Sequence, residues 1–106
     1  MAGSLEGLLV LDLTSHLSGP YCAMLLADHG ADVIKIEQPD KGDNARSMPP
    51  FVNGESAPFM IWNRNKRSVA MDLKAAEDRE LFLTLADQAD IVVENFRPGV
   101  LDRHVG

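Results

Sequence analysis

The sequence predicts an α/β fold with a mainly parallel sheet. Residues 8–13 form a short, nearly continuous apolar run, which is typical of a strand buried on both faces of a parallel sheet. Residues 32–37 are rich in β-branched side chains and predict a second strand. The segment between them has Pro20 at its start and Gly30 just past its end, as helices often do. A strand, a helix and a strand in this order make a βαβ unit with a right-handed crossover.

The second half of the chain continues the alternation of strands and helices. Residues 38–58 contain four prolines and show no clear period, so they predict a long loop, which is a candidate lid or ligand-facing segment. Residues 68–73 predict a strand, and residues 75–88 predict a helix with its apolar side chains on one stripe. Residues 90–96 predict a further strand, and residues 100–105 are consistent with the start of another helix.

Length and composition set the class of protein. A chain of 106 residues is long enough for one hydrophobic core and short for a complete metabolic enzyme. The formal net charge of −6 opposes binding to nucleic acid or to an anionic membrane surface. The single cysteine, Cys22, forms no internal disulfide, which fits a reducing compartment, and we expect a cytoplasmic location. The sequence has no signal-peptide pattern and no stretch near the roughly 20 apolar residues of a membrane-spanning helix.

The residues that follow the strands are the first candidates for a binding site. Ligands of open parallel sheets bind beyond the carboxyl ends of the strands. Here these segments are residues 14–19, 37–43, 72–74 and 95–99. The first segment leads into a helix N-terminus, which favours an anionic ligand group, although the sequence alone favours a plain turn with Ser18 as the N-cap over such a site. No GxGxxG fingerprint is present, so a dinucleotide site is not supported.

Basic residues concentrate around position 66. Residues 63–68 hold three cations, and we expect Lys66, Arg67 and Lys74 to form a local positive patch that suits a phosphate. The alternative is a solvated loop that leads into a strand. The histidines lack the spacing of metal ligands, so we expect no metal site, and no residue has the setting of a catalytic nucleophile.

Beyond its periodicity, the sequence resembles the N-terminal region of the family III CoA-transferases, also called the CaiB/BaiF type. This group includes formyl-CoA transferase, the carnitine CoA-transferases and, more distantly, α-methylacyl-CoA racemase. The resemblance runs in register along the whole chain. It is carried by LEGLLVLDLT (5–14), GP (19–20), ADHGADVIKIE (27–37), GD (42–43) with Arg46, NKRS (65–68), DLK (72–74) and ADIVVENFRPG (89–99) with Leu101.

The resemblance implies a Rossmann-like larger domain, a smaller second domain and an interlocked homodimer. It implies transfer of CoA from an acyl-CoA to a carboxylic acid acceptor, with CoA as a substrate and no further cofactor. The intermediate is an acyl-enzyme on an aspartate, which is nucleophilic catalysis by a carboxylate. Residues 1–106 would be the N-terminal part of the CoA-binding domain, with the aspartate and the small domain beyond residue 106. We therefore expect no catalytic residue within the chain.

The resemblance also assigns binding roles to residues at matching positions. It places Leu17 and Ser18 beside CoA, and Lys74 and Arg103 at its phosphates. The complete set of implied CoA-binding residues is Leu17, Ser18, Met71, Asp72, Leu73, Lys74, Asn95, Phe96, Arg97 and Arg103. One departure is Gln38, where the family often has a basic residue.

Two alternatives stay open at the level of the sequence. One is a fragment of an acyl-CoA racemase of the same superfamily, which the downstream sequence would distinguish. The other is a stand-alone nucleotide-binding module without catalysis.

Overall fold

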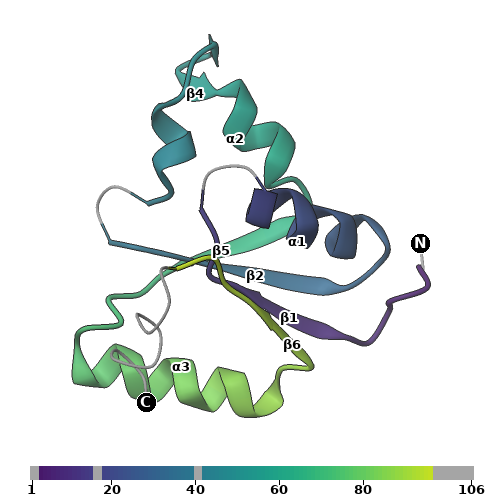
Figure 1. Cartoon of the computed structure of the whole chain (residues 1–106), viewed down its shortest axis with the longest axis vertical. Coiled ribbons are helices and arrows are strands. Elements are labelled where there is room, and N and C mark those ends of the chain that lie inside the picture. The colour runs from purple at the N-terminus through teal and green to yellow at the C-terminus, as the bar shows by residue number, and fades with distance from the viewer. Residues whose placement is uncertain (1–2, 16–17, 40–41, 97–106) are drawn as a thin grey trace.

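The computed structural model describes residues 3–15, 18–39 and 42–96 and shows an α/β arrangement (Figure 1). In chain order the elements are β1 (Leu9–Asp12), α1 (Ser18–Asp28), β2 (Asp32–Glu37), η1 (Asn44–Ser47), β3 (Phe51–Val52), β4 (Glu55–Ser56), α2 (Ala57–Trp62), β5 (Lys66–Ala70), α3 (Ala76–Gln88) and β6 (Ile91–Val93). The predicted helix over residues 100–105 lies outside the described residues.

The main sheet has four strands in the order β5-β2-β1-β6, and every neighbouring pair is parallel. This confirms the predicted α/β fold with a parallel sheet. In the register of the sheet, Val10 lies between Val33 of β2 and Ile91 of β6. β1 and β2 have neighbours on both sides, and their apolar residues are buried except Leu9, which is half-buried, whereas Ile91 of the edge strand β6 is exposed.

One helix covers each face of the sheet, α3 on one side and α1 on the other (Figure 1). Alternate residues of a strand point to opposite faces, so Leu11 packs in the cluster with Phe82 of α3 while Val10 packs with Ala23 of α1. Phe82 is buried, and complete burial of such a side chain is worth about 1.5–3 kcal/mol. The two clusters fix both helices against the sheet.

Several boundaries differ from the predicted ones. The strand predicted over residues 68–73 begins at Lys66 and ends at Ala70, because the chain turns at Asp72, whose carboxylate accepts a hydrogen bond from the Lys74 amide at 3.0 Å. The first helix begins at Ser18, so Ser18 is a helical residue rather than the predicted N-cap. Pro20 fits the first turn since the N–H groups there have no partner inside the helix.

The prediction of a long loop over residues 38–58 is wrong. This segment holds η1, a hairpin of β3 and β4, and the start of α2. Asn53 and Gly54 form the tip of the hairpin with φ values of 52° and 83°, the positive values that a tight Asn-Gly hairpin turn requires. The Ser56 hydroxyl accepts a hydrogen bond from the Phe59 amide at 3.3 Å and caps α2.

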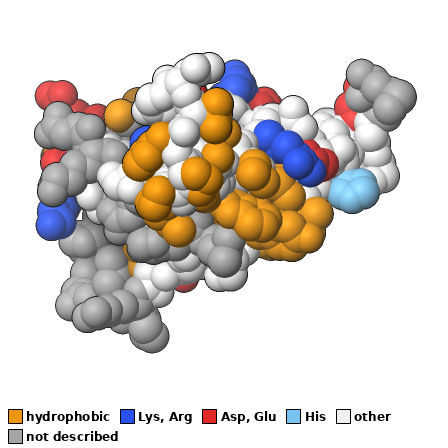
Figure 2. Space-filling model, turned by 90° about the horizontal axis from the view of Figure 1, so that it is seen from above, with side chains coloured by type: hydrophobic (Ala, Val, Ile, Leu, Met, Phe, Trp, Pro, Cys, Tyr) orange, Lys and Arg blue, Asp and Glu red, His pale blue; other side chains and the backbone are white. Residues whose placement is uncertain are grey.

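The hairpin and α2 stand away from the sheet, beyond α1 (Figure 1). Trp62 of α2 meets Tyr21 of α1 edge to face, with ring centroids 5.2 Å apart, which holds α2 against α1. Hydrophobic side chains gather on the face seen in Figure 2. Phe51 and Ile61 are each 52% exposed, so this region carries apolar surface that the described residues do not cover.

Candidate functional site

A cavity of about 570 Å³ opens at the carboxyl ends of the parallel strands, where ligands of such sheets bind. Its walls come from the ends of β1 and β2, from the turn after β5 and from the segment after β6. The lining residues are Leu13, Thr14, Ser15, Ile36, Glu37, Gln38, Pro39, Gly42, Asp43, Met71, Asp72, Leu73, Lys74 and Phe96.

Half of the residues that the sequence assigned to a binding site line this cavity. They are Met71, Asp72, Leu73, Lys74 and Phe96. Asn95 is not part of the lining but forms hydrogen bonds with the lining residue Ser15. Ser18, at the start of α1, is exposed and is not part of the lining. Leu17, Arg97 and Arg103 lie outside the described residues.

The turn after β5 brings one cation, Lys74, to the cavity lining. Asp78 in the first turn of α3 accepts a hydrogen bond from the Asp72 amide at 2.8 Å, and Asp72 in turn accepts one from the Lys74 amide. These two bonds fix the backbone of the turn while the Lys74 side chain stays exposed. An exposed ammonium at the rim of a cavity can reach an anionic group of a ligand.

The wall after β1 is held by a buried carboxylate. Asp12 accepts a hydrogen bond from the Thr14 amide at 2.9 Å and a second, short one from the Thr14 hydroxyl. Both residues are buried. Gly19 lies so close to Thr14 that a Cβ at position 19 would stand 2.4 Å from the Thr14 Cβ. The first turn of α1 therefore packs directly on this wall.

Glu37, the last residue of β2, organises the third wall. Its carboxylate accepts hydrogen bonds from the Asp43 amide at 2.9 Å, from Arg46 Nε at 2.7 Å and Nη2 at 2.8 Å, and from the Ser68 hydroxyl. Burial by itself raises the pKa of Glu37, but the hydrogen bonds from Arg46, Ser68 and Asp43 outweigh it and lower the pKa to about 2. Glu37 is thus a carboxylate at neutral pH and accepts bonds instead of transferring protons.

The Arg46 guanidinium is sandwiched between this carboxylate and α2. Its central carbon lies 3.9 Å from the centre of the Phe59 ring, a cation–π contact. The stack joins the segment that forms the third wall to the projecting helix α2.

The predicted positive patch of Lys66, Arg67 and Lys74 does not form. Neighbouring residues of a strand point to opposite faces, and Lys66 turns inward, where its ammonium contacts Asp12 at 2.7 Å. Burial lowers the pKa of Lys66, although Asp12 opposes this effect. Arg67 pairs with Asp32 at 2.6 Å on the surface. Of these three cations, only Lys74 lines the cavity.

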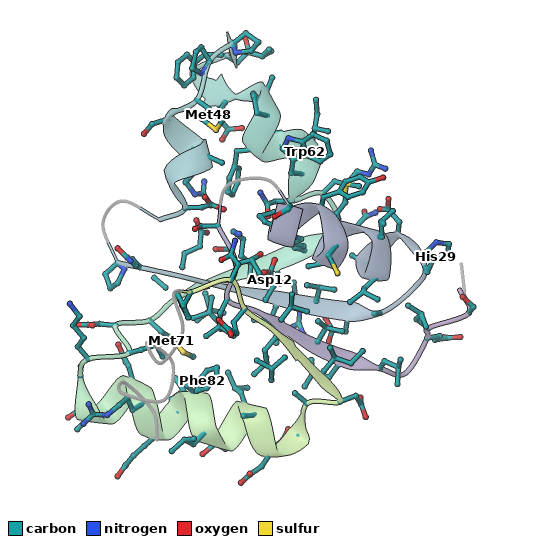
Figure 3. All side chains as sticks on the ribbon, in the orientation of Figure 1. Asp12, His29, Met48, Trp62, Met71 and Phe82 are labelled. Atoms are coloured by element: carbon teal, nitrogen blue, oxygen red, sulfur yellow. The ribbon has the colours of Figure 1, made fainter. Side chains whose placement is uncertain are left out.

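Buried charges next to the cavity form a group that we call the ion cluster, namely Asp12, Lys35, Asp43 and Lys66, of which Asp43 lines the cavity. Their side chains are each at most 1% exposed. Figure 3 shows Asp12 at the centre of the fold, and Met71 and Phe82 between the sheet and α3. The sequence analysis missed the cluster, although Asp12 and Lys35 stand inside otherwise apolar runs. A charge in a buried strand needs a partner. A charged residue inside an otherwise apolar strand pattern is therefore the signal by which such a cluster can be recognised.

The described ranges 3–15, 18–39 and 42–96 contain neither a metal-binding group of side chains nor a membrane-spanning helix. Within them, no three His, Cys, Asp or Glu side chains are grouped in a way that would hold a metal ion. Their helices also lack the length and apolar character needed to cross a membrane.

The sequence matches a family model over nearly its whole length. Residues 5–105 match the model of CoA-transferase family III. The chain is 54% identical over 106 residues to the succinyl-CoA:mesaconate CoA-transferase of Haloarcula hispanica, with 95% of this chain and 26% of that protein covered. It is 48% identical over 101 residues to the acetyl-CoA:oxalate CoA-transferase of Acetobacter aceti, with 95% and 26% covered.

Comparison of the fold with solved structures points to the same family as the sequence. A crystal structure of a CAIB/BAIF family protein from Brucella suis matches with a TM-score of 0.91 at 42% identity, over 98% of this chain and 29% of that chain. The present chain spans about a quarter of the length of the curated relatives. With the family model matching from residue 5 to residue 105, the chain belongs to CoA-transferase family III.

Proposed function

We propose that this chain is the CoA-binding portion of an enzyme that transfers CoA from an acyl-CoA to a carboxylic acid. The observation that carries the proposal is the convergence of Met71, Asp72, Leu73, Lys74 and Phe96 on one cavity. The family resemblance assigns these residues to CoA independently of the cavity. The names of the two relatives, both CoA-transferases, support the reaction class.

Among the residues that the structure describes, the cavity combines apolar surface with one exposed cation, and two of its three carboxylates, Glu37 and Asp43, are paired with Arg46 and Lys35. Leu13, Ile36, Met71 and Phe96 provide apolar surface, and Lys74 provides a cation at the rim. The volume of about 570 Å³ is in the range of small-molecule sites. We assign Lys74 to a phosphate of CoA, and we keep the same assignment for Arg103, with Leu17, Ser18, Asn95 and Arg97 in the remaining contacts.

The covalent step of the proposed reaction requires a carboxylate nucleophile. A carboxylate attacks the thioester carbonyl of the acyl-CoA, the bond to sulfur breaks and CoA leaves as a thiolate, so that a mixed anhydride forms on the enzyme. We assign this role to an aspartate outside residues 1–106. In the same proposal the working enzyme is a cytoplasmic, interlocked homodimer, with CoA as a substrate and no further cofactor.

A calorimetric titration of CoA into the chain tests binding. CoA carries several negative charges, and exposed ion pairs are worth only about 0–1 kcal/mol each, so we expect weak binding that weakens further as salt is raised. Lys74→Ala should raise the dissociation constant a few-fold, by roughly the factor that such a pair supplies. Arg67→Ala is the matched control because it removes the same charge from a residue paired with Asp32 outside the cavity lining.

Two results of this titration would contradict the proposal. Equal weakening by both substitutions would show that only net charge matters and would remove Lys74 from the site. No detectable binding by the unmodified chain at low salt would contradict the proposal that the cavity binds CoA by itself.

A further inference from the structure

A single buried ammonium, that of Lys35 in β2, joins two walls of the cavity. Lys35 Nζ donates a hydrogen bond to the Thr14 carbonyl oxygen at 3.0 Å and pairs with Asp43 Oδ2 at 2.9 Å. Thr14 and Asp43 line the cavity from the segments after β1 and β2. They are 29 residues apart, as their numbers show, and both contact the same nitrogen atom.

The surroundings of Lys35 leave little freedom for these contacts. Its side chain is 1% exposed, and Asp12 Oδ2 lies 4.0 Å from the ammonium. Asp12 itself holds the Thr14 amide and hydroxyl. The Thr14 backbone is thus held at its N–H by the carboxylate and at its carbonyl by the ammonium.

The second cation of the ion cluster has different neighbours. Lys66 Nζ contacts Asp12 at 2.7 Å, the Pro20 carbonyl at 3.0 Å and the Asn63 side chain at 2.8 Å. Pro20 and Asn63 are not among the residues that line the cavity. The side chains of Lys35 and Lys66 are each 1% exposed, but of the two only Lys35 contacts both walls directly.

We propose that Lys35 is a positioning residue that sets the separation of the Thr14 and Asp43 walls and thereby the affinity of the cavity for CoA. The part that concerns CoA rests on the proposed function. Lys35 touches no ligand in this proposal, since it lies beneath the walls. Its effect is to keep the cavity in the binding shape before the ligand arrives, which lowers the cost of ordering the walls.

Three variants of the 106-residue chain test the proposal. Lys35→Met keeps the length of the side chain and removes the ammonium. Lys35→Met with Asp43→Asn also removes the carboxylate that would otherwise remain buried without its cation, so it protects the fold. Lys66→Met is the matched control. Each is studied by thermal unfolding, by titration with CoA and by amide hydrogen exchange.

We expect both Lys35 variants to weaken CoA binding about tenfold or more, the scale on which misplaced binding groups act. Lys66→Met should lower the melting temperature but leave the dissociation constant within about twofold, a difference well under 1.4 kcal/mol. In the Lys35 variants, exchange should rise at the amides of Thr14, Gly42 and Asp43 more than at the strand amide of Asp32. In Lys66→Met it should rise at Asn63 instead.

Hydrogen exchange also separates this proposal from the proposed function. If the unmodified chain binds no CoA, the exchange pattern still decides whether Lys35 positions the two walls. A uniform rise across the sheet, the same pattern in Lys66→Met, or unfolding of both Lys35 variants would overturn the proposal. Each of these results would make Lys35 a residue of general stability.

Discussion

Asn95 and Ser15 are paired through the Asn95 side chain in the way that two strands pair through their backbones. Asn95 Nδ2 donates to the Ser15 carbonyl at 3.0 Å, and the Ser15 amide donates to Asn95 Oδ1 at 3.3 Å. Ser15 and Asn95 come two residues after Leu13 and Val93, and the Leu13 amide donates a backbone hydrogen bond to the Val93 carbonyl at 2.9 Å. The contact between the ends of β1 and β6 is thereby extended to the edge of the cavity.

Replacing Asn95 with Ala should loosen this edge of the cavity. Removal of two ordinary hydrogen bonds at an exposed position should lower the free energy of unfolding by about 1 kcal/mol. CoA binding should weaken as well, since Ser15 lines the cavity. Chemical denaturation and titration measure the two effects. Gln88→Ala, at the exposed end of α3, is the control. An equal loss of stability and of CoA affinity in Gln88→Ala would show that the effect does not come from the Asn95–Ser15 pair.

Glu37 gives the chain a defined loss of stability in acid. Its pKa falls from 4.5 to about 2 on folding, so its contribution is fully present above about pH 5 and disappears as the pH falls through 4.5 toward 2. The contribution is at most roughly 3 kcal/mol, since one pKa unit corresponds to about 1.4 kcal/mol. Urea unfolding at several pH values should show a smaller acid-dependent loss for Glu37→Gln than for the unmodified chain. Parallel curves would contradict this assignment.

Gly19→Ala should destabilise the chain although the position is helical. In an ordinary helix this change is favourable by up to about 1 kcal/mol. Here the new methyl group would stand 2.4 Å from Thr14 Cβ, and Asp12 holds the Thr14 side chain in place. We expect a loss of about 1–3 kcal/mol, the range for overpacked sites. Ser18→Ala, one residue earlier and exposed, is the control for the helix start, and a stabilised Gly19→Ala would refute the close packing.

The hairpin tip offers a test of backbone strain without any clash. A Cβ at Gly54 meets nothing within 4 Å, but φ at this position is 83°. Gly54→Ala should therefore cost about 1–2 kcal/mol, the cost of left-handed backbone for an L-residue. Asn53→Gly, at the preceding positive φ, should be tolerated far better. Thermal unfolding distinguishes the two, and a tolerated Gly54→Ala would show that the hairpin tip rearranges freely.

The sequence predicts the central part of this fold well because buried parallel strands leave a strong local signal. The apolar runs that contain Val10 and Ile34 are flanked on both sides in the sheet, and both runs were identified as strands. The position of the cavity followed from the rule that ligands bind beyond strand ends. The hairpin of β3 and β4 was missed because two-residue strands are too short to show a period, although Asn53-Gly54 is a turn signal.

The prediction failed where the outcome depends on distant partners. Lys66 and Arg67 are adjacent in sequence and were predicted to act together. In the fold, Lys66 reaches Asp12 while Arg67 reaches Asp32. The direction of a side chain depends on which strand face is buried, and this is settled by the arrangement of the sheet. For the same reason the contacts that Lys35 makes with Thr14 and Asp43 could not be read from local pattern.

The strand order also has a consequence for synthesis on the ribosome. β1 is the first of the described strands along the chain, yet it occupies an interior position with β2 on one side and β6 on the other. Its pairing with β6, in which Val10 lies opposite Ile91, waits until nearly all of the described chain has been translated. Until then one edge of an apolar strand stays unpaired, and unpaired edges are sites of aggregation. We therefore expect this chain to be most prone to aggregation before β6 has been made.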